Sequence, residues 1–422
     1  MHSNQVKILG TLILFIIKCT SDELQLVYQW NQISAPKLDR DKSNVVFNSS
    51  DEPPKNNETF YAYGNLPMGV AHHKGRLFLT FPRRRPGTPY TLAVINMNTV
   101  RDVNNPPMTG YPEPIVNTLH LDYAADSKRI VSVYRARVDK CDRLWFVDTG
   151  YLEYPGNKRQ VQRPSLWVIN LSTDRRIQRF EIPAEIVELG YGMASVTVDV
   201  EPDKCDEAYA YIPDYEWQGL YVYSLSQNRM WRFKHIFFSF EPQYGNFNVA
   251  GIRFVWNDGL FSVAIGNTDS VTGNRMVYLH AMAAVGEIAV SNSVLKNETL
   301  AHSGDDYNQL FKHLGSRGPN TQSSSHTFDE STGVLFYAEV NRNSIGCWNS
   351  KQKFDADNHG IVHLDNSNMI YPADLTIDNE GVIWVISNKL PIWIYSKLNV
   401  TDFNYHIWRQ TAETAIDGTI CM

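Results

Sequence analysis

The sequence predicts an all-β protein, a six-bladed β-propeller built as a single domain. A hairpin-like unit recurs six times along the chain, and its turns are short and rich in Asp, Asn and Gly. No long window shows a strong helical periodicity. Two β-sandwiches are the alternative, but the regular unit and the lack of a linker between the halves argue against them.

Each unit begins with two strand-like runs joined by a polar turn, and a third apolar-alternating run follows most of them. The six hairpins span residues 67–80, 132–148, 194–214, 249–266, 323–339 and 373–388. In the fourth, we expect the inner strand at 249–255, the turn at 257–259 and the second strand at 260–266. The sixth is the clearest, because Asp378-Asn379-Glu380-Gly381 separates two apolar runs.

A propeller must join its first and last blades, because open sheets expose unpaired edges. Residues 24–30 form a strand-like segment that precedes the first unit. We expect it to pair with the last blade, followed by a polar connecting segment over 31–58.

The N-terminal residues have the pattern of a secretory signal peptide. Lys7 precedes an apolar run over 8–17, and small and polar residues follow it. A membrane anchor is the alternative, but the run is far shorter than the roughly 20 residues that a spanning helix needs. We therefore expect cleavage near Ser21, a mature domain over 22–422 and a secreted protein without a membrane anchor.

Composition and cysteines agree with an extracellular globular protein. Hydrophobic residues make up 43% of the chain, and the net charge of −6 does not favour nucleic acid as a partner. Cys141 and Cys205 occupy equivalent turns of blades two and three, so we pair them, and Cys347 with Cys421. No cysteines have the close spacing of a zinc site. The N-glycosylation sequons begin at Asn48, Asn57, Asn170, Asn297 and Asn399.

Common catalytic signatures are absent from the sequence. It contains no G-x-S-x-G, His-Glu-x-x-His or Walker motif, so we expect neither a cofactor nor a metal. The run Arg83-Arg84-Arg85 could hold an anion, but such a run is more typical of a solvated turn.

The fold predicts where a site would form. In each blade the inner strand begins and the second strand ends at the same mouth of the central channel, so polar residues at these points should converge. They can serve chemistry, or they can cap strand ends and tie blades together. The residues are Asn65, Met68, Arg135, Asp148, Ser195, Asp214, Asn267, Ser324, Glu339, Asp374 and Asn388.

Several motifs resemble the Yellow and major royal jelly protein family. They lie at residues 65–70, 132–150, 346–349 and 371–375, and the likeness covers nearly the whole mature chain. Residues 315–323 and 407–410 are most similar to the insect Yellow-f subgroup. That subgroup implies dopachrome conversion in melanin synthesis, whereas other members resemble storage proteins or binders of biogenic amines.

The resemblance implies a secreted dopachrome tautomerase that forms 5,6-dihydroxyindole with loss of the substrate carboxylate. A non-catalytic binder of biogenic amines or catechols, and a structural or signalling cuticle protein, are the alternatives. We expect Glu339, with a raised pKa, to transfer the proton, Asp374 to be the second carboxylate, and Arg135 to steer the substrate carboxylate. The expected substrate-binding residues are Met68, Asp148, Asp214, Ser324 and Asn388.

Overall fold

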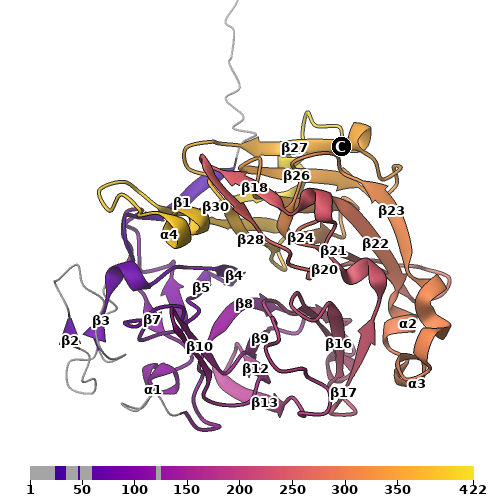
Figure 1. Ribbon diagram of the computed structural model, residues 1–422, viewed down its shortest axis with the longest axis horizontal. Helices are drawn as coiled ribbons and strands as arrows, with labels where there is room; N and C mark the ends of the chain where they lie inside the picture. The colour runs from indigo at the N-terminus through magenta and orange to yellow at the C-terminus, as the bar shows by residue number, and fades with distance from the viewer. Residues whose placement is uncertain (1–23, 35–45, 48–58, 120–124) are drawn as a thin grey trace, which may run out of the picture.

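The computed structural model describes residues 24–34, 46–47, 59–119 and 125–422 of the chain. Within them, six four-stranded antiparallel sheets surround a common axis as the blades of a propeller (Figure 1). The predicted fold class is therefore confirmed.

Each blade has four strands, which follow one another from the axis outward. Blade one contains β4 (Gly69–His73), β5 (Arg76–Thr80), β6 (Leu92–Asn96) and β7 (Thr109–Gly110). Blade two contains β8 (Val133–Val138), β9 (Arg143–Asp148), β12 (Ser165–Asn170) and β13 (Arg175–Glu181). Blade three contains β14 (Thr197–Asp199), β15 (Tyr209–Asp214), β16 (Gly219–Ser224) and β17 (Arg229–Lys234).

The second half of the chain repeats this order. Blade four contains β20 (Leu260–Thr268), β21 (Arg275–Ala281), β22 (Gly286–Ser291) and β23 (Lys312–Ser316). Blade five contains β24 (Ser323–Asp329), β25 (Val334–Glu339), β26 (Ser344–Asn349) and β27 (His359–Leu364). Blade six contains β28 (Pro372–Ile377), β29 (Val382–Ser387), β30 (Tyr405–Thr411) and β1 (Gln25–Trp30).

Shorter elements connect the blades. The two-stranded sheets are β2 (Val46–Phe47) with β3 (Thr59–Phe60), β10 (Tyr151–Tyr154) with β11 (Asn157–Gln160), and β18 (Asn246–Val249) with β19 (Ile252–Val255). The α-helices are α1 (Pro114–Asn117), α2 (Asn292–Leu295), α3 (Glu298–Ala301), α4 (Leu390–Tyr395) and α5 (Ala412–Ala415). The 3-10 helices are Ala62–Gly64, Cys205–Glu207, Ile236–Phe238, Pro242–Tyr244, Gly304–Leu310 and Ala356–Asn358. Among the described residues, none of these helices is long and apolar enough to cross a membrane.

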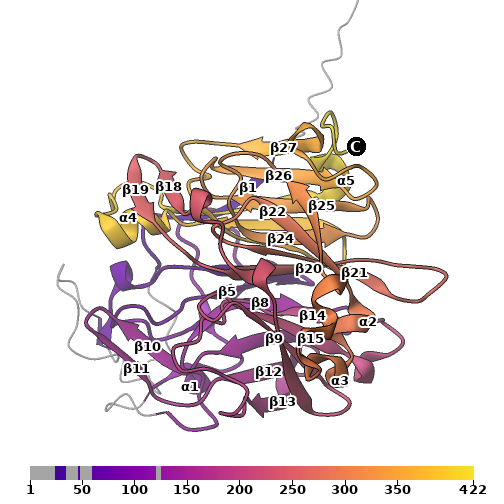
Figure 2. The same ribbon diagram turned by 45° about the vertical axis from the view of Figure 1, so that its right-hand side comes forward.

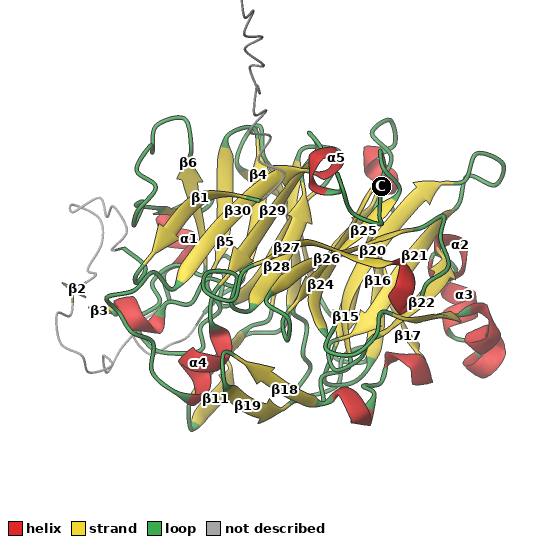
Figure 3. Ribbon diagram, turned by 90° about the horizontal axis from the view of Figure 1, so that it is seen from above, coloured by secondary structure: helices red, strands yellow, loops and turns green. Residues whose placement is uncertain are grey.

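Two ends of the propeller can be distinguished. We call the end at which the inner strands begin the upper face, and the end with the hairpin turns between inner and second strands the lower face. β11, β18, β19 and α4 lie together on the upper face (Figure 3). These additional elements place many side chains around the upper end of the axis.

The first described strand closes the ring. β1 pairs antiparallel with β30, from Gln25 opposite Arg409 to Trp30 opposite Tyr405. In Figure 1 the indigo strand β1 lies beside the yellow strand β30, and Figure 2 shows the ring from a second direction. β1 covers the outer edge of β30 and so fixes the N-terminal segment to the last blade, and the predicted pairing is confirmed.

The same hydrogen bond from a Trp side chain to an Asp carboxylate stabilises the lower turns of blades two and six. Asp139 accepts a hydrogen bond from Trp145 Nε1 at 2.7 Å, and Asp378 accepts one from Trp384 Nε1 at 2.8 Å. The other oxygen of each carboxylate accepts two backbone N–H groups of its own turn. An Asp that begins a turn, six residues before a buried Trp, therefore fixes the hairpin in both blades.

Blade four differs from the prediction by one strand. Residues 249–255 were expected as its inner strand, but they belong to the β18–β19 hairpin, and β20 is the inner strand. Ala250 and Gly251 have positive φ angles of 48° and 84°, which make a tight turn inside an otherwise strand-like run. Asn267 consequently lies at the lower end of β20 and is exposed, so its predicted place at the upper mouth is wrong.

Both predicted disulfides are present. Cys141–Cys205 joins the lower turns of blades two and three, and Cys347–Cys421 joins β26 to the C-terminal end of the chain. The signal segment 1–21 and the sequons at Asn48 and Asn57 lie outside the described residues. The remaining sequon asparagines are half-buried at Asn170 and exposed at Asn297 and Asn399.

Candidate functional site

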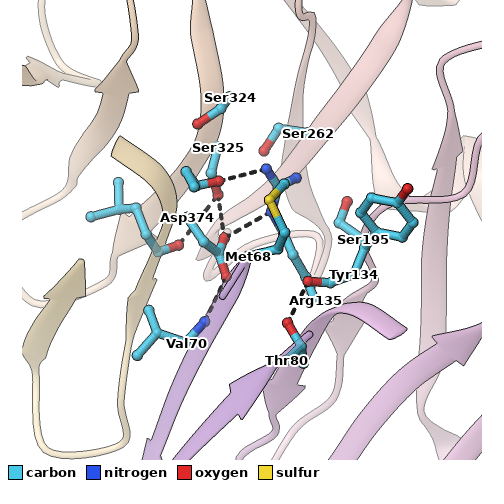
Figure 4. Close-up of polar contacts among 12 residues, drawn as sticks. Met68, Val70, Thr80, Tyr134, Arg135, Ser195, Ser262, Ser324, Ser325 and Asp374 are labelled. Atoms are coloured by element: carbon cyan, nitrogen blue, oxygen red, sulfur yellow. Dashed lines mark hydrogen bonds and ion pairs between the residues drawn. The ribbon is translucent and has the colours of Figure 1, made fainter. Parts of the chain in front are cut away.

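The carboxylate of Asp374 on β28 is the centre of a buried ionic cluster near the axis (Figure 4). Arg137 donates to both of its oxygens, at 2.9 and 2.7 Å, and Arg135 Nε lies 3.3 Å from Oδ1. Ser325 Oγ donates to Oδ1 at 3.0 Å, and the Val70 N–H donates to Oδ2 at 3.2 Å. Because these donors belong to blades one, two and five, Asp374 connects them to blade six.

Arg135 is the member of this cluster that keeps an unused donor. Its side chain is 2% exposed, and its Nη2 donates to the Ala373 carbonyl at 2.6 Å. The guanidinium lies over the ring of Phe261, 5.0 Å from the centroid. Its Nη1 has no hydrogen-bond partner among the described residues. Burial lowers the pKa of Arg135, and the charge of Asp374 opposes this shift. A buried arginine with a free N–H suits a carboxylate ligand.

Aromatic side chains surround the upper end of the axis beside Arg135. The rings of Tyr215 and Phe261 lie 5.3 Å apart, and those of Trp256 and Tyr371 lie 6.2 Å apart, edge to face. Burial raises the pKa of the phenols of Tyr134, Tyr215 and Tyr371 above the ordinary value. These phenols therefore stay protonated at neutral pH and can donate hydrogen bonds.

Asp258 adds a carboxyl group with an unusual pKa to this aromatic site. Burial and the charge of Glu216 raise its pKa to about 6, while the charge of Arg84 opposes the rise. The adjacent Gly259 N–H donates to the Tyr215 carbonyl at 2.9 Å, which holds this turn against the aromatic rings. The carboxyl of Asp258 can thus exchange a proton near neutral pH.

Three of the predicted substrate-binding residues lie close to the axis. Asn388 Nδ2 donates to the Pro67 carbonyl at 2.7 Å and contacts Met68 Sδ at 3.2 Å. Ser324 Oγ donates to the Pro372 carbonyl at 2.6 Å. Figure 4 shows Met68 and Ser324 with Arg135 and Asp374. Their polar groups tie neighbouring blades together around the site.

Two other predicted substrate-binding residues, Asp148 and Asp214, have a structural role as strand-end caps. Each is fully buried and accepts three backbone N–H groups, at 2.9–3.0 Å for Asp148 and 2.9–3.1 Å for Asp214. Asp148 also accepts from Gln162, and Asp214 accepts from Tyr221. With these hydrogen bonds formed, the two carboxylates cap the ends of β9 and β15.

The structure does not bring Glu339 to the site. Its carboxylate contacts His359 Nε2 at 2.5 Å, Ser344 Oγ at 2.8 Å and Arg342 Nη1 at 3.6 Å, all within blade five. Burial alone would raise its pKa, but the hydrogen bonds from His359 and Ser344 and the charge of Arg342 lower it. The predicted raised pKa of Glu339 is therefore wrong, because Ser344 and His359 on the outer strands of its blade donate to it and Arg342 adds a nearby positive charge.

Asp258 and Tyr215 are site residues that the sequence did not reveal. Asp258 belongs to the segment 257–259, which has the composition of an ordinary hairpin turn.

The prediction of a solvated turn at the arginine run is wrong for Arg83. Its side chain is 1% exposed, and its guanidinium donates to backbone carbonyls that include those of Thr88 and Ile130. A polar turn and a basic run carry no signal of burial, which only the packing of the upper face reveals.

A separate cavity of about 680 Å³ opens at the lower face. Its walls come from the lower ends of inner strands and their turns, and they carry charges of both signs. Lining residues include Arg137, Lys140, Arg275, His326, Asp329 and Glu330. Arg137 therefore separates this cavity from Asp374 and Arg135.

Known proteins resemble this chain over most of its length. Residues 131–421 match the sequence model of the family described as Major royal jelly protein. The L-dopachrome tautomerase yellow-f of Drosophila melanogaster is 47% identical over 93% of this chain and 89% of its own length. Protein yellow of Drosophila yakuba is 35% identical over 94% of this chain and 71% of its own length. Among solved structures, a streptogramin B lyase structure is similar with a TM-score of 0.41 and 10% identity, covering 82% of this chain and 94% of that chain.

Proposed function

Because the chain belongs to the major royal jelly protein family, we propose that it is a dopachrome tautomerase with its site at the upper aromatic face. The observation that carries this proposal is the extensive identity to a relative named L-dopachrome tautomerase. The geometry supports it, since one place holds aromatic rings, a buried arginine and a carboxyl group with a pKa of about 6.

Dopachrome is a flat quinone-imine that carries a carboxylate. In its conversion, a ring carbon loses a proton to a base and the two quinone oxygens each gain one. A second electron pair enters the ring from another C–H bond, which also releases the second proton, or from the C–carboxylate bond, which breaks to release CO₂ while solvent supplies the second proton. Electrons only rearrange within the substrate, so the reaction needs no external oxidant or reductant.

Each requirement has a matching group at the upper face. Arg135 Nη1 holds the substrate carboxylate, and the rings of Tyr215 and Phe261 pack against the bicyclic ring. Asp258 accepts the carbon-bound proton. The protonated phenol of Tyr371 donates toward a quinone oxygen, where negative charge develops. We propose 5,6-dihydroxyindole, formed with CO₂ release, as the main product.

The test is the decay of L-dopachrome absorbance with purified protein, measured against the spontaneous rate. We expect faster decay with wild-type protein, and Asp258→Asn should lose roughly 10²–10⁴-fold in kcat, as is typical for a general base. Asp269→Asn, an exposed carboxylate of the lower β20–β21 turn, is the matched control and should retain full activity. Chromatography of the products separates 5,6-dihydroxyindole from its 2-carboxylic acid.

A binder of biogenic amines is the second candidate function. Glu153 accepts a hydrogen bond from Tyr134, so a second carboxylate lies beside the rings and could pair with an ammonium group. Saturable binding of an amine by calorimetry, with no acceleration of dopachrome decay, would favour this function over the tautomerase.

We further propose that the protein is secreted and acts in melanin synthesis. The signal-like segment, the exposed sequon asparagines Asn297 and Asn399, and the two disulfides support an extracellular location. N-terminal sequencing of protein from the medium should begin close to Asp22, and removal of N-glycans should lower the apparent mass. Protein retained in cells with Met1 intact would contradict secretion.

A further inference from the structure

Four buried polar side chains meet between blades four and five. His280 lies on β21, Glu287 on β22, His326 on β24 and Tyr337 on β25. The side chains of His280, Glu287 and His326 are 0% exposed, and Tyr337 is also 0% exposed. The site is separate from the upper aromatic face, and the proposed dopachrome chemistry does not use it.

Each of these side chains has a polar atom without a hydrogen-bond partner among the described residues. The atoms are His280 Nδ1, Glu287 Oε1, His326 Nε2 and Tyr337 OH. Buried polar atoms in native proteins almost always have partners, because an unpaired one costs about 1–3 kcal/mol. The two imidazoles lie 3.2 and 3.5 Å from the Glu287 carboxylate, so these atoms form a compact group that one bound species could contact.

The distances between the donor atoms suit a metal ion. His280 Nδ1 lies 3.5 Å from Glu287 Oε2, and His326 Nε2 lies 3.2 Å from Glu287 Oε1. One donor atom from each of the three residues lies within 4.8 Å of the others. Tetrahedral zinc with bonds of about 2.0–2.1 Å places its ligands about 3.3–3.4 Å apart. Only small side-chain movements would therefore bring the donors to bonding distance.

The outer atoms of the same side chains are already fixed. His280 Nε2 lies 3.1 Å from the Ser323 carbonyl, which can only accept, so this nitrogen carries the hydrogen and Nδ1 is free to bind a metal. His326 Nδ1 contacts Ser262 Oγ at 2.7 Å. Arg317 Nη1 donates to Glu287 Oε2 at 2.9 Å, which leaves Oε1 for the ion. Metal ligands typically have such outer partners.

We propose that His280, Glu287 and His326 bind one divalent transition-metal ion of the zinc type, which joins blade four to blade five. Two imidazoles and one carboxylate form a ligand set that zinc uses in proteins. The sequence shows no metal-ligand spacing because the ligands come from three strands.

Arg317 defines the competing occupant. Its guanidinium already balances the charge of Glu287, so a water molecule hydrogen-bonded to the same atoms is the alternative to a metal ion. Metal content and the absorption spectrum after exchange for Co²⁺ distinguish a bound metal ion from a bound water molecule.

The first test measures metal content in purified, gel-filtered wild-type protein by inductively coupled plasma mass spectrometry. We expect about one zinc-type ion per chain. We also expect that exchange for Co²⁺ gives visible absorption bands, and that chelator treatment lowers the thermal midpoint. Metal content below about a tenth per chain after reloading with Zn²⁺, with no Co²⁺ spectrum, would overturn the proposal in favour of water.

Variants locate the site. His280→Gln should lose at least tenfold in metal content and in the thermal shift on adding Zn²⁺. His406→Gln is the matched control, because His406 is a buried blade-six histidine whose two ring nitrogens are also without hydrogen-bond partners among the described residues. It should keep the metal even if its stability falls.

Full metal content in folded His280→Gln would place the ion elsewhere and contradict the assignment. If His280→Gln does not fold, the wild-type metal content and Co²⁺ spectrum decide the question. Neither depends on dopachrome turnover, so this test and the test of the proposed function can fail independently.

Discussion

Arg137 of blade two and Asp374 of blade six form a doubly hydrogen-bonded ion pair, although blade one lies between them. The guanidinium nitrogens Nη1 and Nη2 lie 2.9 and 2.7 Å from the two carboxylate oxygens. Asp374 also accepts a hydrogen bond from the Val70 N–H of β4, so the ion pair is bonded to the inner strand of blade one. The contact connects three blades near the point where the ring closes.

Asp374→Asn should therefore destabilise the fold. Removal of the carboxylate leaves Arg135 and Arg137 without their buried partner, and breaking a buried ion pair costs about 3–5 kcal/mol. We expect a fall of that size in the free energy of unfolding by urea titration. Asp355→Asn, which breaks an exposed pair with Lys353, is the control and should leave the midpoint unchanged. A loss below about 1 kcal/mol in Asp374→Asn would show that the cluster does not support the ring.

The activity should depend on pH through Asp258. Its pKa is raised to about 6, and the proposed base must be ionised, so kcat/KM should fall as the pH drops below about 6. Glu216→Gln removes a charge that raises this pKa, and it should move the acidic limb of the profile to lower pH. Rate profiles from pH 4.5 to 8, corrected for spontaneous decay, measure both effects. An acidic limb that does not move in Glu216→Gln would assign the titration to another group.

Asp258→Asn should also make the protein more stable at neutral pH. The folded-state pKa lies above the ordinary value of 3.8, so the native state binds this proton more tightly than the unfolded chain does. The ionised carboxylate therefore reduces stability as the pH rises from about 4 to above 6. Urea titrations at pH 7.5 should show a higher midpoint for the variant than for wild type, and the difference should shrink at pH 4.

Glu339→Gln should affect stability and leave turnover nearly unchanged. The pKa of Glu339 is lowered, so its contribution is fully present above about 4.5, the ordinary value, and is lost as the pH falls through the lowered pKa. We expect a loss of about 3–5 kcal/mol at pH 7, because His359 and Arg342 lose a buried partner. Unfolding titrations at pH 7 and kcat/KM of the folded variant measure the two effects. A large fall in kcat/KM without loss of stability would restore Glu339 as a catalytic residue.

Each disulfide should contribute about 4 kcal/mol of stability. The bridges join residues separated by 64 and 74 positions, and loops of this size lose about that much chain entropy in the unfolded state. Replacement of Cys141 and Cys205 together by Ser should lower the free energy of unfolding accordingly. Peptide mapping without reduction should yield only the Cys141–Cys205 and Cys347–Cys421 pairs, and a Cys141–Cys347 peptide would contradict the blade order.

Much of the fold could be predicted because the relevant signals are local. Alternating apolar residues, Asp-rich and Gly-rich turns and equivalent cysteine positions repeat in each blade, and each reports the conformation of a few neighbouring residues. For the same reason, the sequence predicts the inner strand of blade four at residues 249–255, whereas the structure has it at β20. An alternating run such as 249–255 fits an inner strand and a capping hairpin equally well, and the turn at Ala250 and Gly251 is visible only in the backbone.

The amino-acid sequence alone therefore determined the propeller, the ring closure by residues 24–30, the disulfide pairing and the resemblance to a family. Only the tertiary structure decided which carboxylates face the site. Asp258 has a raised pKa because the upper-face elements shield it from water and place Glu216 near it, whereas Glu339 has a lowered pKa because β26 and β27 supply its donors. Likewise, His280, Glu287 and His326 come together only when blades four and five pack side by side. The pKa and ligand geometry of a side chain depend on neighbours from distant segments, and no local pattern in the chain records them.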